Sequence, residues 1–254
     1  MWRFAKACAI GAAHERAGRA CEDRVKVERI GRDVLICAVA DGAGSAGRGG
    51  DGARLAVETA TNRLAHFVTD GALPSLETVR GSVLLARDQI QRAARFEDLP
   101  ARAFACTLLL VVLGREGGVA AQIGDGAIVT REQGDEGWGW AFWPQHGEFA
   151  NQTRFVTDED AHLRLQCEAL PPAIRDVALF SDGLERLALH YASRAVHGPL
   201  FDKLFAPLWR SAGEGEIRPL SAGLEATLRS VTIRERTHDD LSLVLATRRT
   251  VPEA

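Results

Sequence analysis

The sequence contains little of what stabilises small secreted domains or Cys/His metal modules. Its five cysteines are odd in number, lie far apart and form no Cys-x-x-Cys pair: Cys8, Cys21, Cys37, Cys106 and Cys167. That pattern predicts neither a disulfide framework nor a zinc site. Free cysteines in apolar runs behave as small hydrophobic residues, and their use here indicates a reducing cytoplasm as the compartment.

Long hydrophobic runs and an excess of one charge are also missing. No stretch reaches the roughly 18 apolar residues that a membrane span requires, so no membrane partner is expected. The 31 Lys and Arg residues nearly balance 34 Asp and Glu residues, and the formal net charge is −3. Without a basic run, the chain is not expected to bind nucleic acid. The apolar part of the N-terminus, residues 7–13, stops at His14, which predicts a first strand rather than a cleaved signal peptide.

What is present is an ordinary globular composition. The 254 residues are 46% hydrophobic and 26% charged, and a chain of this length buries about three quarters of its unfolded surface. No internal repeat, low-complexity tract or linker divides the sequence. It therefore predicts one domain over residues 1–254.

Hydrophobic patterning predicts strands and helices in separate blocks. Continuous apolar runs, typical of strands buried on both faces, occur at residues 34–40, 107–113, 119–123, 127–130, 177–180 and 241–246. Helical spacing predicts helices over residues 52–67, capped by Asp51, and over 76–95, 188–210 and 220–231. Residues 131–157 are expected to form irregular or hairpin structure. Segregated blocks of this kind favour an α+β fold over a βαβ repeat.

Acidic residues recur where the predicted strands begin or end. Three Asp-Gly pairs close apolar runs, and two further acidic pairs precede strands; the five pairs are Asp41-Gly42, Asp125-Gly126, Asp182-Gly183, Asp239-Asp240 and Glu22-Asp23. Asp-Gly is a common turn dipeptide, and a turn alone explains any single pair, Asp70-Gly71 included. Five acidic pairs at one rim of a sheet, however, would repel one another unless cations neutralise them.

The ligand type predicts which cation binds. Carboxylates, backbone carbonyls and waters are hard oxygen donors that suit Mg²⁺ or Mn²⁺ and suit Zn²⁺ poorly. Several shared aspartates favour two ions about 3.5–4 Å apart, an arrangement that activates water for displacement at phosphorus. The glycine-rich segment 41–50 is neither a P-loop nor an EF-hand, because it lacks the residue spacing of both.

In their order and spacing these motifs resemble the metal-dependent type 2C (PPM) serine/threonine protein phosphatases, in particular the bacterial branch whose first aspartate motif reads Asp-Gly-Ala-Gly-Ser. The matching segments span nearly the whole chain: His14, Cys21-Glu22-Asp23, Asp41-Gly42-Ala43-Gly44-Ser45, Thr107-Leu108-Leu109, Gly124-Asp125-Gly126, Gly147-Glu148-Phe149-Ala150-Asn151-Gln152-Thr153, Ser181-Asp182-Gly183-Leu184 and Asp239-Asp240-Leu241-Ser242. The resemblance implies a four-layer α-β-β-α sandwich of two mainly antiparallel sheets flanked by helices. It also implies hydrolysis of phosphoserine or phosphothreonine in proteins at a two-metal centre, with a cognate Ser/Thr kinase as the opposing partner.

The resemblance further implies a role for each acidic residue. Asp41 would bridge two Mn²⁺ or Mg²⁺ ions, and the carbonyl of Gly42 would bind one of them. Asp182 and Asp239 would bind one ion together with Asp41, while Asp23 and, through water, Glu22 would bind the other. Asp125 would bind a weak third ion. Asp41, Asp182 and Asp239 are therefore the residues expected to be essential for catalysis. Asp240 is expected to hold its own turn instead.

Three positions depart from the family pattern. Gly18 stands where better-studied members have a phosphate-binding Arg, which leaves three candidates for phosphate binding nearby, namely Arg16, Arg19 and His14. A solvated surface arginine and a packed histidine are the plain structural alternatives. Ala43 stands where other members have a general-acid His, so a metal-bound water or His14 would protonate the leaving group. Arg186 stands where a carboxylate often supports a third ion, and its charge should weaken that site.

Two other function classes remain open from the sequence. The missing Arg and His are also compatible with a catalytically weak or inactive regulatory scaffold. A metallophosphatase acting on small phosphorylated metabolites is disfavoured because the sequence shows no obvious Lys/Arg clamp. The aromatic run Trp138, Trp140, Phe142 and Trp143 is interpreted as half-buried hairpin packing in preference to a peptide-binding surface.

Overall fold

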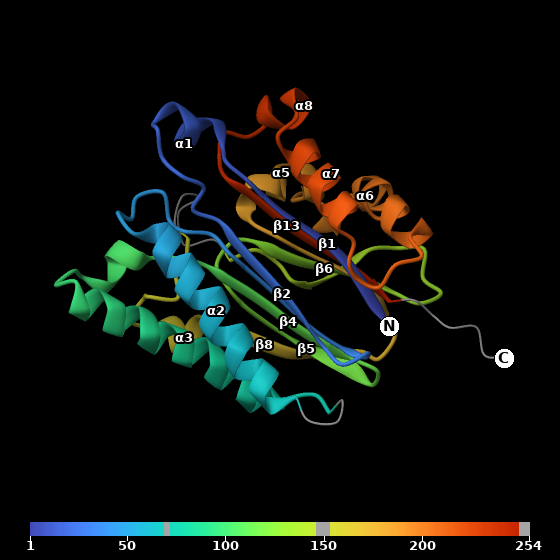
Figure 1. The fold of residues 1–254 in the computed structure, drawn as a ribbon, viewed down its shortest axis with the longest axis horizontal. Coiled ribbons are helices and arrows are strands. Elements are labelled where there is room, and N and C mark those ends of the chain that lie inside the picture. The colour runs from blue at the N-terminus through green and yellow to red at the C-terminus, as the bar shows by residue number, and fades with distance from the viewer. Residues whose placement is uncertain (69–71, 146–152, 249–254) are drawn as a thin grey trace.

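Two β-sheets lie face to face between two layers of helices in the computed structural model, which describes residues 1–68, 72–145 and 153–248 (Figure 1). The first sheet has the strand order β2-β3-β4-β5-β8, and all its neighbours are antiparallel. The second has the order β12-β1-β13-β9-β6-β7, and only β12 runs parallel to its neighbour. The predicted α+β sandwich of two mainly antiparallel sheets is confirmed.

The first sheet packs one face against two long helices and the other face against the second sheet. Its strands are β2 (Arg24–Ile30), β3 (Val34–Ala40), β4 (Leu108–Gly114), β5 (Gly117–Ile123) and β8 (Gln166–Leu170). Strand β3 shows why its sequence is apolar throughout: Ile36 and Ala38 belong to the hydrophobic cluster that includes residues of helices α2 (Gly49–Phe67) and α3 (Leu76–Phe96), while Leu35 and Cys37 face the second sheet. Alternate residues of a strand point to opposite faces, so both sets must be hydrophobic.

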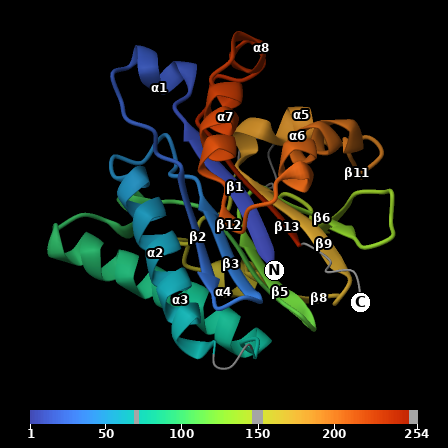
Figure 2. The same ribbon diagram turned by 45° about the vertical axis from the view of Figure 1, so that its right-hand side comes forward.

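The second sheet is covered on its outer face by α6 (Gly198–Arg210) and α7 (Arg218–Leu228), as the rotated view shows (Figure 2). Its strands are β1 (Trp2–Ala9), β6 (Ala127–Glu132), β7 (Gly139–Phe142), β9 (Ile174–Phe180), β12 (Gly215–Glu216) and β13 (Leu241–Arg248). Phe201 and Phe205 of α6 are fully buried against this sheet. No helix in the described part of the chain is long and apolar enough to cross a membrane.

Short elements make up the rest of the described secondary structure, and several of them adjoin the loops around the site. They are α1 (Ala12–Arg16), α4 (Ala161–Arg164), α5 (Glu185–Ala188), α8 (Val231–Arg234), the 3₁₀ turns η1 (Ala101–Phe104) and η2 (Asp182–Leu184), and the strand pair β10 (Leu189–His190) and β11 (Ala195–Val196). All five cysteines are free. The aromatic run lies on and beside β7, where Phe142 is buried and Trp138 stacks on Phe201 and Phe205, which confirms hairpin packing for most of it.

Two of the predicted helix boundaries are wrong. The first helix begins at Gly49, so Asp51 lies in its first turn and pairs with Arg48 at 2.7 Å instead of capping the helix. The helix predicted from residue 188 starts only at Gly198, because 189–190 and 195–196 form the β10–β11 pair. Pro199, in the first turn of α6, explains the true start, since proline has no N–H to donate and fits only where no helical partner is needed.

Strand direction brings the acidic pairs to one edge of the sandwich. In the first sheet Arg24 at the start of β2 pairs with Ala40 at the end of β3, so Asp23 and Asp41 are neighbours. In the second sheet the end of β9 lies beside the start of β13, which places Asp182 next to the Asp239-Asp240 pair. Strand β5 ends at the same edge, two positions before Asp125. The predicted convergence of the five pairs is therefore present.

Candidate active site

Asp41 lies at the centre of the acidic cluster. Burial, followed by the negative charges of Asp23, Asp182 and Asp239, raises the pKa of Asp41 well above its usual range. The pKa of Asp41 is therefore governed by its place among these carboxylates. Like charges this close share a proton unless a cation replaces it.

The neighbours of Asp41 are perturbed in the same direction. Burial raises the pKa of Asp23, whose side chain is almost entirely inaccessible, to about 6. Burial, and then the charges of Asp125 and Asp239, raise the pKa of Asp182 to about 7. The pKa of Glu185 is raised to about 8 by burial and by the charges of Asp125 and Asp182. Glu185 is an acidic residue of the cluster that the sequence analysis missed, because it follows no strand and forms no motif.

The backbone around Asp41 and Asp182 is fixed by close contacts. The N–H of Asp41 donates to Thr107 Oγ1 at 3.0 Å, and the N–H of Thr107 returns a bond to the Asp41 carbonyl at 2.9 Å. A Cβ on Gly42 would lie 2.3 Å from the carbonyl carbon of Gly49, and one on Gly183 would lie 2.2 Å from the carbonyl oxygen of Asp240. Glycine after each aspartate is therefore a steric requirement of the assembled site.

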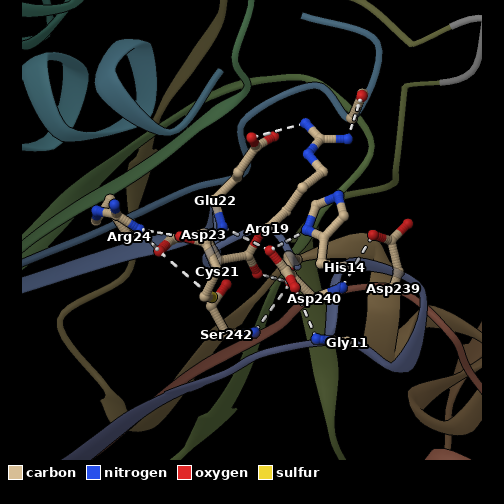
Figure 3. A network of polar contacts seen from close by, with 12 residues as sticks. Gly11, His14, Arg19, Cys21, Glu22, Asp23, Arg24, Asp239, Asp240 and Ser242 are labelled. Carbon is tan, nitrogen blue, oxygen red and sulfur yellow. Dashed lines mark hydrogen bonds and ion pairs between the residues drawn. The ribbon is translucent and has the colours of Figure 1, made fainter. Parts of the chain in front are cut away.

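Asp240 is the anchor of the N-terminal segment of the site (Figure 3). Its side chain is buried and accepts hydrogen bonds from the N–H of Gly11 at 2.7 Å, the N–H of Glu22 at 2.5 Å and Nδ1 of His14 at 2.9 Å. These partners lie more than 200 positions earlier in the chain. The prediction that the Asp240 side chain holds the turn is wrong. The local turn bond is instead accepted by Asp239, whose Oδ1 receives the N–H of Asp240 at 2.9 Å.

Ser181 joins the two sheets at the site. Its hydroxyl donates to Asp23 Oδ2 at 2.7 Å and accepts the N–H of Ser242 at 3.1 Å. Asp23 precedes β2 of the first sheet, while Ser181 and Ser242 belong to the end of β9 and to β13 in the second. Ser181 stood in the sequence motif before Asp182, but nothing in the sequence indicated that it would bind Asp23.

The three candidates for phosphate binding have different surroundings. Arg19 uses both terminal nitrogens of its guanidinium group, one on the Gly44 carbonyl at 2.8 Å and one on Glu22 Oε1 at 2.7 Å. His14 is buried, with Nδ1 on Asp240. Arg16 is exposed on α1, and its side chain makes no hydrogen bond or ion pair with any residue that the structure describes. Arg19 is thus held by Glu22, whereas Arg16 makes no described hydrogen bond or ion pair with the cluster.

A cavity of about 460 Å³ opens beside the acidic cluster. Asp125, Asp182, Glu185 and Asp239 are among the residues that line it. Asp125 also accepts a hydrogen bond from the Thr153 hydroxyl. The remainder of the predicted motif, Gly147 to Gln152, lies outside the described residues, as does Asp70-Gly71.

The acidic cluster meets the chemical requirements of a divalent-cation site. Three buried carboxylate oxygens have no hydrogen-bond partner among the described residues: Glu22 Oε2, Asp23 Oδ1 and Asp182 Oδ1. An unpaired buried carboxylate oxygen is costly unless a cation or a donor satisfies it. No three described His, Cys, Asp or Glu side chains already converge on one metal position. The residues therefore fit hard cations by their chemistry and unpaired oxygens, without a preformed cage.

Comparisons with known proteins agree with this arrangement. Residues 10–229 match the family model described as Protein phosphatase 2C. The chain is 35% identical to Serine/threonine-protein phosphatase 3 of Escherichia coli (strain K12) over 252 residues, covering 96% of this chain and 98% of that protein. Its fold is similar to that of a bacterial serine phosphatase, with a TM-score of 0.70 at 13% identity, covering 98% of this chain and 99% of the other. It is also similar to the catalytic domain of the serine threonine protein phosphatase PstP in complex with 2 manganese ions, with a TM-score of 0.63 at 17% identity and 97% of each chain covered.

The family model includes the segments that carry four of the five acidic pairs and stops before Asp239-Asp240, whereas the relative from Escherichia coli matches 96% of the chain. The low identity of the structural neighbours supports the fold alone, whereas the family model and the relative from Escherichia coli support common descent. The resemblance drawn from the motifs is confirmed at the level of the family. This chain belongs to the protein phosphatase 2C family.

Proposed function

We propose that this protein hydrolyses phosphoserine and phosphothreonine in proteins, using two Mn²⁺ or Mg²⁺ ions held by the acidic cluster. The observation that carries the proposal is the set of three buried, unpaired carboxylate oxygens of Glu22, Asp23 and Asp182 around Asp41. Buried oxygens of this kind are costly unless a cation, a proton or a hydrogen-bond donor satisfies them, and hard cations beside an open cavity are the usual catalysts of phosphomonoester hydrolysis. The relative named a serine/threonine-protein phosphatase supports a protein substrate over a small metabolite.

Each acidic residue has a proposed part in holding the ions. Asp41 would bridge the two ions, and the carbonyl of Gly42 would bind one of them. Asp182 and Asp239 would bind one ion together with Asp41, while Asp23 and, through water, Glu22 would bind the other. Asp125 would bind a weak third ion. When bound, the ions would neutralise the charge of the phosphoryl group and lower the pKa of a water to near neutrality. The central position of Asp41 between Asp23 and Asp182 supports its assignment as the bridge.

The remaining polar residues orient these carboxylates. Arg19 fixes one oxygen of Glu22 and leaves the other, Oε2, buried and unpaired. Ser181 does the same for Asp23, occupying Oδ2 and leaving Oδ1 unpaired. A side chain held by one oxygen has lost most of its rotational freedom before a cation arrives, so less entropy is lost on binding.

The substrates and surroundings of the enzyme follow from this activity. Phosphorylated proteins are the proposed substrates, with a cognate Ser/Thr kinase adding the phosphoryl groups that this enzyme removes. The five free cysteines are consistent with action in a reducing cytoplasm.

The test is hydrolysis of p-nitrophenyl phosphate and of a phosphothreonine peptide in Mn²⁺, in Mg²⁺ and in EDTA. Activity is expected with either metal and none after exhaustive chelation. Asp41→Ala should lower kcat/KM by at least roughly 10³-fold, about 4 kcal/mol of transition-state stabilisation. Asp182→Ala and Asp239→Ala should cost nearly as much, with partial rescue by millimolar Mn²⁺, and Asp125→Ala should cost less.

Asp88 supplies the matched control for these variants. It lies exposed on α3, on the other side of the first sheet, so Asp88→Ala should keep the wild-type rate. A folded Asp41→Ala protein with wild-type rates would overturn the assignment of the bridge. A folded wild-type protein without turnover in either metal would favour the scaffold alternative.

A further inference from the structure

Two arginines are among the residues that line the cavity beside the acidic cluster. They are Arg186 and Arg236, and His238 lines the same cavity. Arg186 lies on α5, four positions after Asp182, and Arg236 lies in the loop three positions before Asp239. Each arginine is thus attached through a few residues of backbone to a proposed metal ligand, so its position relative to the cluster is restricted.

Both guanidinium groups are available to a ligand. Arg186 and Arg236 are exposed, and neither side chain makes a hydrogen bond or ion pair with a residue that the structure describes. Arg19 differs from them, because both of its terminal nitrogens already donate hydrogen bonds, one to Gly44 and one to Glu22. Arg16 and Arg19 do not line this cavity.

The substrate chemistry favours positive charge in this cavity. A phosphate monoester carries two negative charges on three terminal oxygens, and the carboxylates of Asp125, Asp182 and Asp239 repel it. The planar guanidinium group matches a phosphate in both charge and geometry, since it donates two parallel hydrogen bonds. Two such groups in the cavity can bind the phosphoryl oxygens that the cations leave uncovered.

We propose that Arg186 and Arg236 bind the phosphoryl group of the substrate, a role that the sequence analysis had given to Arg16, Arg19 or His14. This inference rests on the proposed function, because it assigns a subsite of the same active site. It requires contact with the phosphoryl group itself and therefore applies to every phosphomonoester substrate, whatever residues surround the phosphorylated side chain.

The experiment compares Arg186→Ala, Arg236→Ala, the double variant and the two lysine variants with wild type. Arg92→Ala on α3 is the matched control, because Arg92 is exposed and distant from the cavity. Three measurements are made in saturating Mn²⁺: kinetics with p-nitrophenyl phosphate, kinetics with phosphothreonine peptides of neutral or acidic flanks, and calorimetric binding of inorganic phosphate. The last measurement needs no turnover and so separates this inference from the proposed function.

Each alanine variant should raise KM about tenfold for all three substrates and weaken phosphate binding by a similar factor. The double variant should lose more, the lysine variants should recover part of the loss, and the Mn²⁺ requirement should stay unchanged. Unchanged KM and unchanged phosphate binding would overturn the proposal. A loss confined to the acidic peptides would overturn it too, since the arginines would then bind flanking residues. If wild type binds phosphate through these arginines but has no turnover, the proposed function fails and this inference stands.

Discussion

Adjacent aspartates at the start of β13 should respond in opposite ways to the same substitution. Asp240 is buried and accepts three hydrogen bonds, through Oδ1 from Gly11 and through Oδ2 from Glu22 and His14. An asparagine has one acceptor oxygen and one NH₂ group, which only donates. In either orientation Asp240→Asn therefore turns its NH₂ group toward at least one buried donor.

The cost of Asp240→Asn follows from these contacts. At least one hydrogen bond to a charged acceptor is lost, worth about 1.5–3 kcal/mol, and the donor left behind is unsatisfied. We expect a loss of about 3 kcal/mol in the free energy of unfolding. For a chain of this size that corresponds to a fall in Tm of roughly 6–12 °C. Activity should fall as well, because Glu22 and its neighbour Asp23 lie on the segment that Asp240 anchors.

Asp239→Asn should have the reverse profile. Asp239 is exposed, and the one bond that its Oδ1 accepts, from the N–H of Asp240 at 2.9 Å, can be kept by an amide oxygen. Its charge lies near Asp41 and Asp182, so neutralising it relieves repulsion in metal-free protein. The Tm in EDTA should be unchanged or slightly higher, while kcat/KM should fall by roughly 10²-fold or more because a proposed metal ligand is lost.

The assay is a thermal melt by circular dichroism in EDTA, together with kcat/KM on p-nitrophenyl phosphate in saturating Mn²⁺. The two variants carry the same chemical change at neighbouring positions, so each is the control for the other. A melt of Asp240→Asn that overlies wild type would refute the anchoring role. Equal destabilisation by both substitutions would refute the conclusion that Asp240 anchors the fold while Asp239 serves as a metal ligand.

Three further predictions concern the residues of the acidic cluster and the backbone beside it. In EDTA the Tm should fall as the pH rises from about 5 to 8, because the raised pKa values of Asp23 (about 6) and Asp182 (about 7) mean that the folded state holds protons that the unfolded state has released. The gain in Tm from Mn²⁺ should grow over the same pH range. A Tm of the metal-free protein that rises with pH would contradict the argument. Ser181→Ala should raise the Mn²⁺ concentration for half-maximal activity by about 10-fold or more, because Asp23 loses its orienting hydroxyl, whereas an unchanged metal titration would show that Ser181 is dispensable. Gly42→Ala should yield little folded protein, as measured by soluble yield and circular dichroism, because its Cβ would lie 2.3 Å from the backbone of Gly49; a normal melt would mean that the Gly42–Gly49 approach can relax.

The position of the acidic cluster was predictable because strand ends are local features. The run 34–40 and the Asp-Gly pair after it fix where β3 stops, and the same holds for Asp125 after β5 and Asp182 near the end of β9. Antiparallel pairing then leaves few ways to arrange these ends, since the start of one strand must lie beside the end of its neighbour. The shared edge of the five acidic pairs follows from patterns that the sequence displays.

The contacts that orient the cluster were not predictable because they join distant parts of the chain. Asp240 binds Gly11 across 229 positions and Ser181 binds Asp23 across 158. Neither pair has a spacing or composition that marks it. The helix predicted from residue 188 failed for a related reason: local apolar spacing favoured a helix, while the pairing of β10 with β11 depends on where the chain turns back.

The geometry of the site is set by the packing between the two sheets. Asp23 and Asp41 extend from the first sheet, and Asp182 and Asp239 from the second, so any ion bridged by Asp41 joins the two layers. Val39, two positions before Asp41, and Leu179, three positions before Asp182, are both buried in the hydrophobic layer that separates the sheets. A change in the volume of that layer shifts the two halves of the cluster relative to each other, and interiors at native density adjust to such changes only in part. Metal affinity should therefore depend on apolar residues that never contact the ions, and the Ser181–Asp23 and Glu22–Asp240 hydrogen bonds are polar contacts that oppose separation of the two halves.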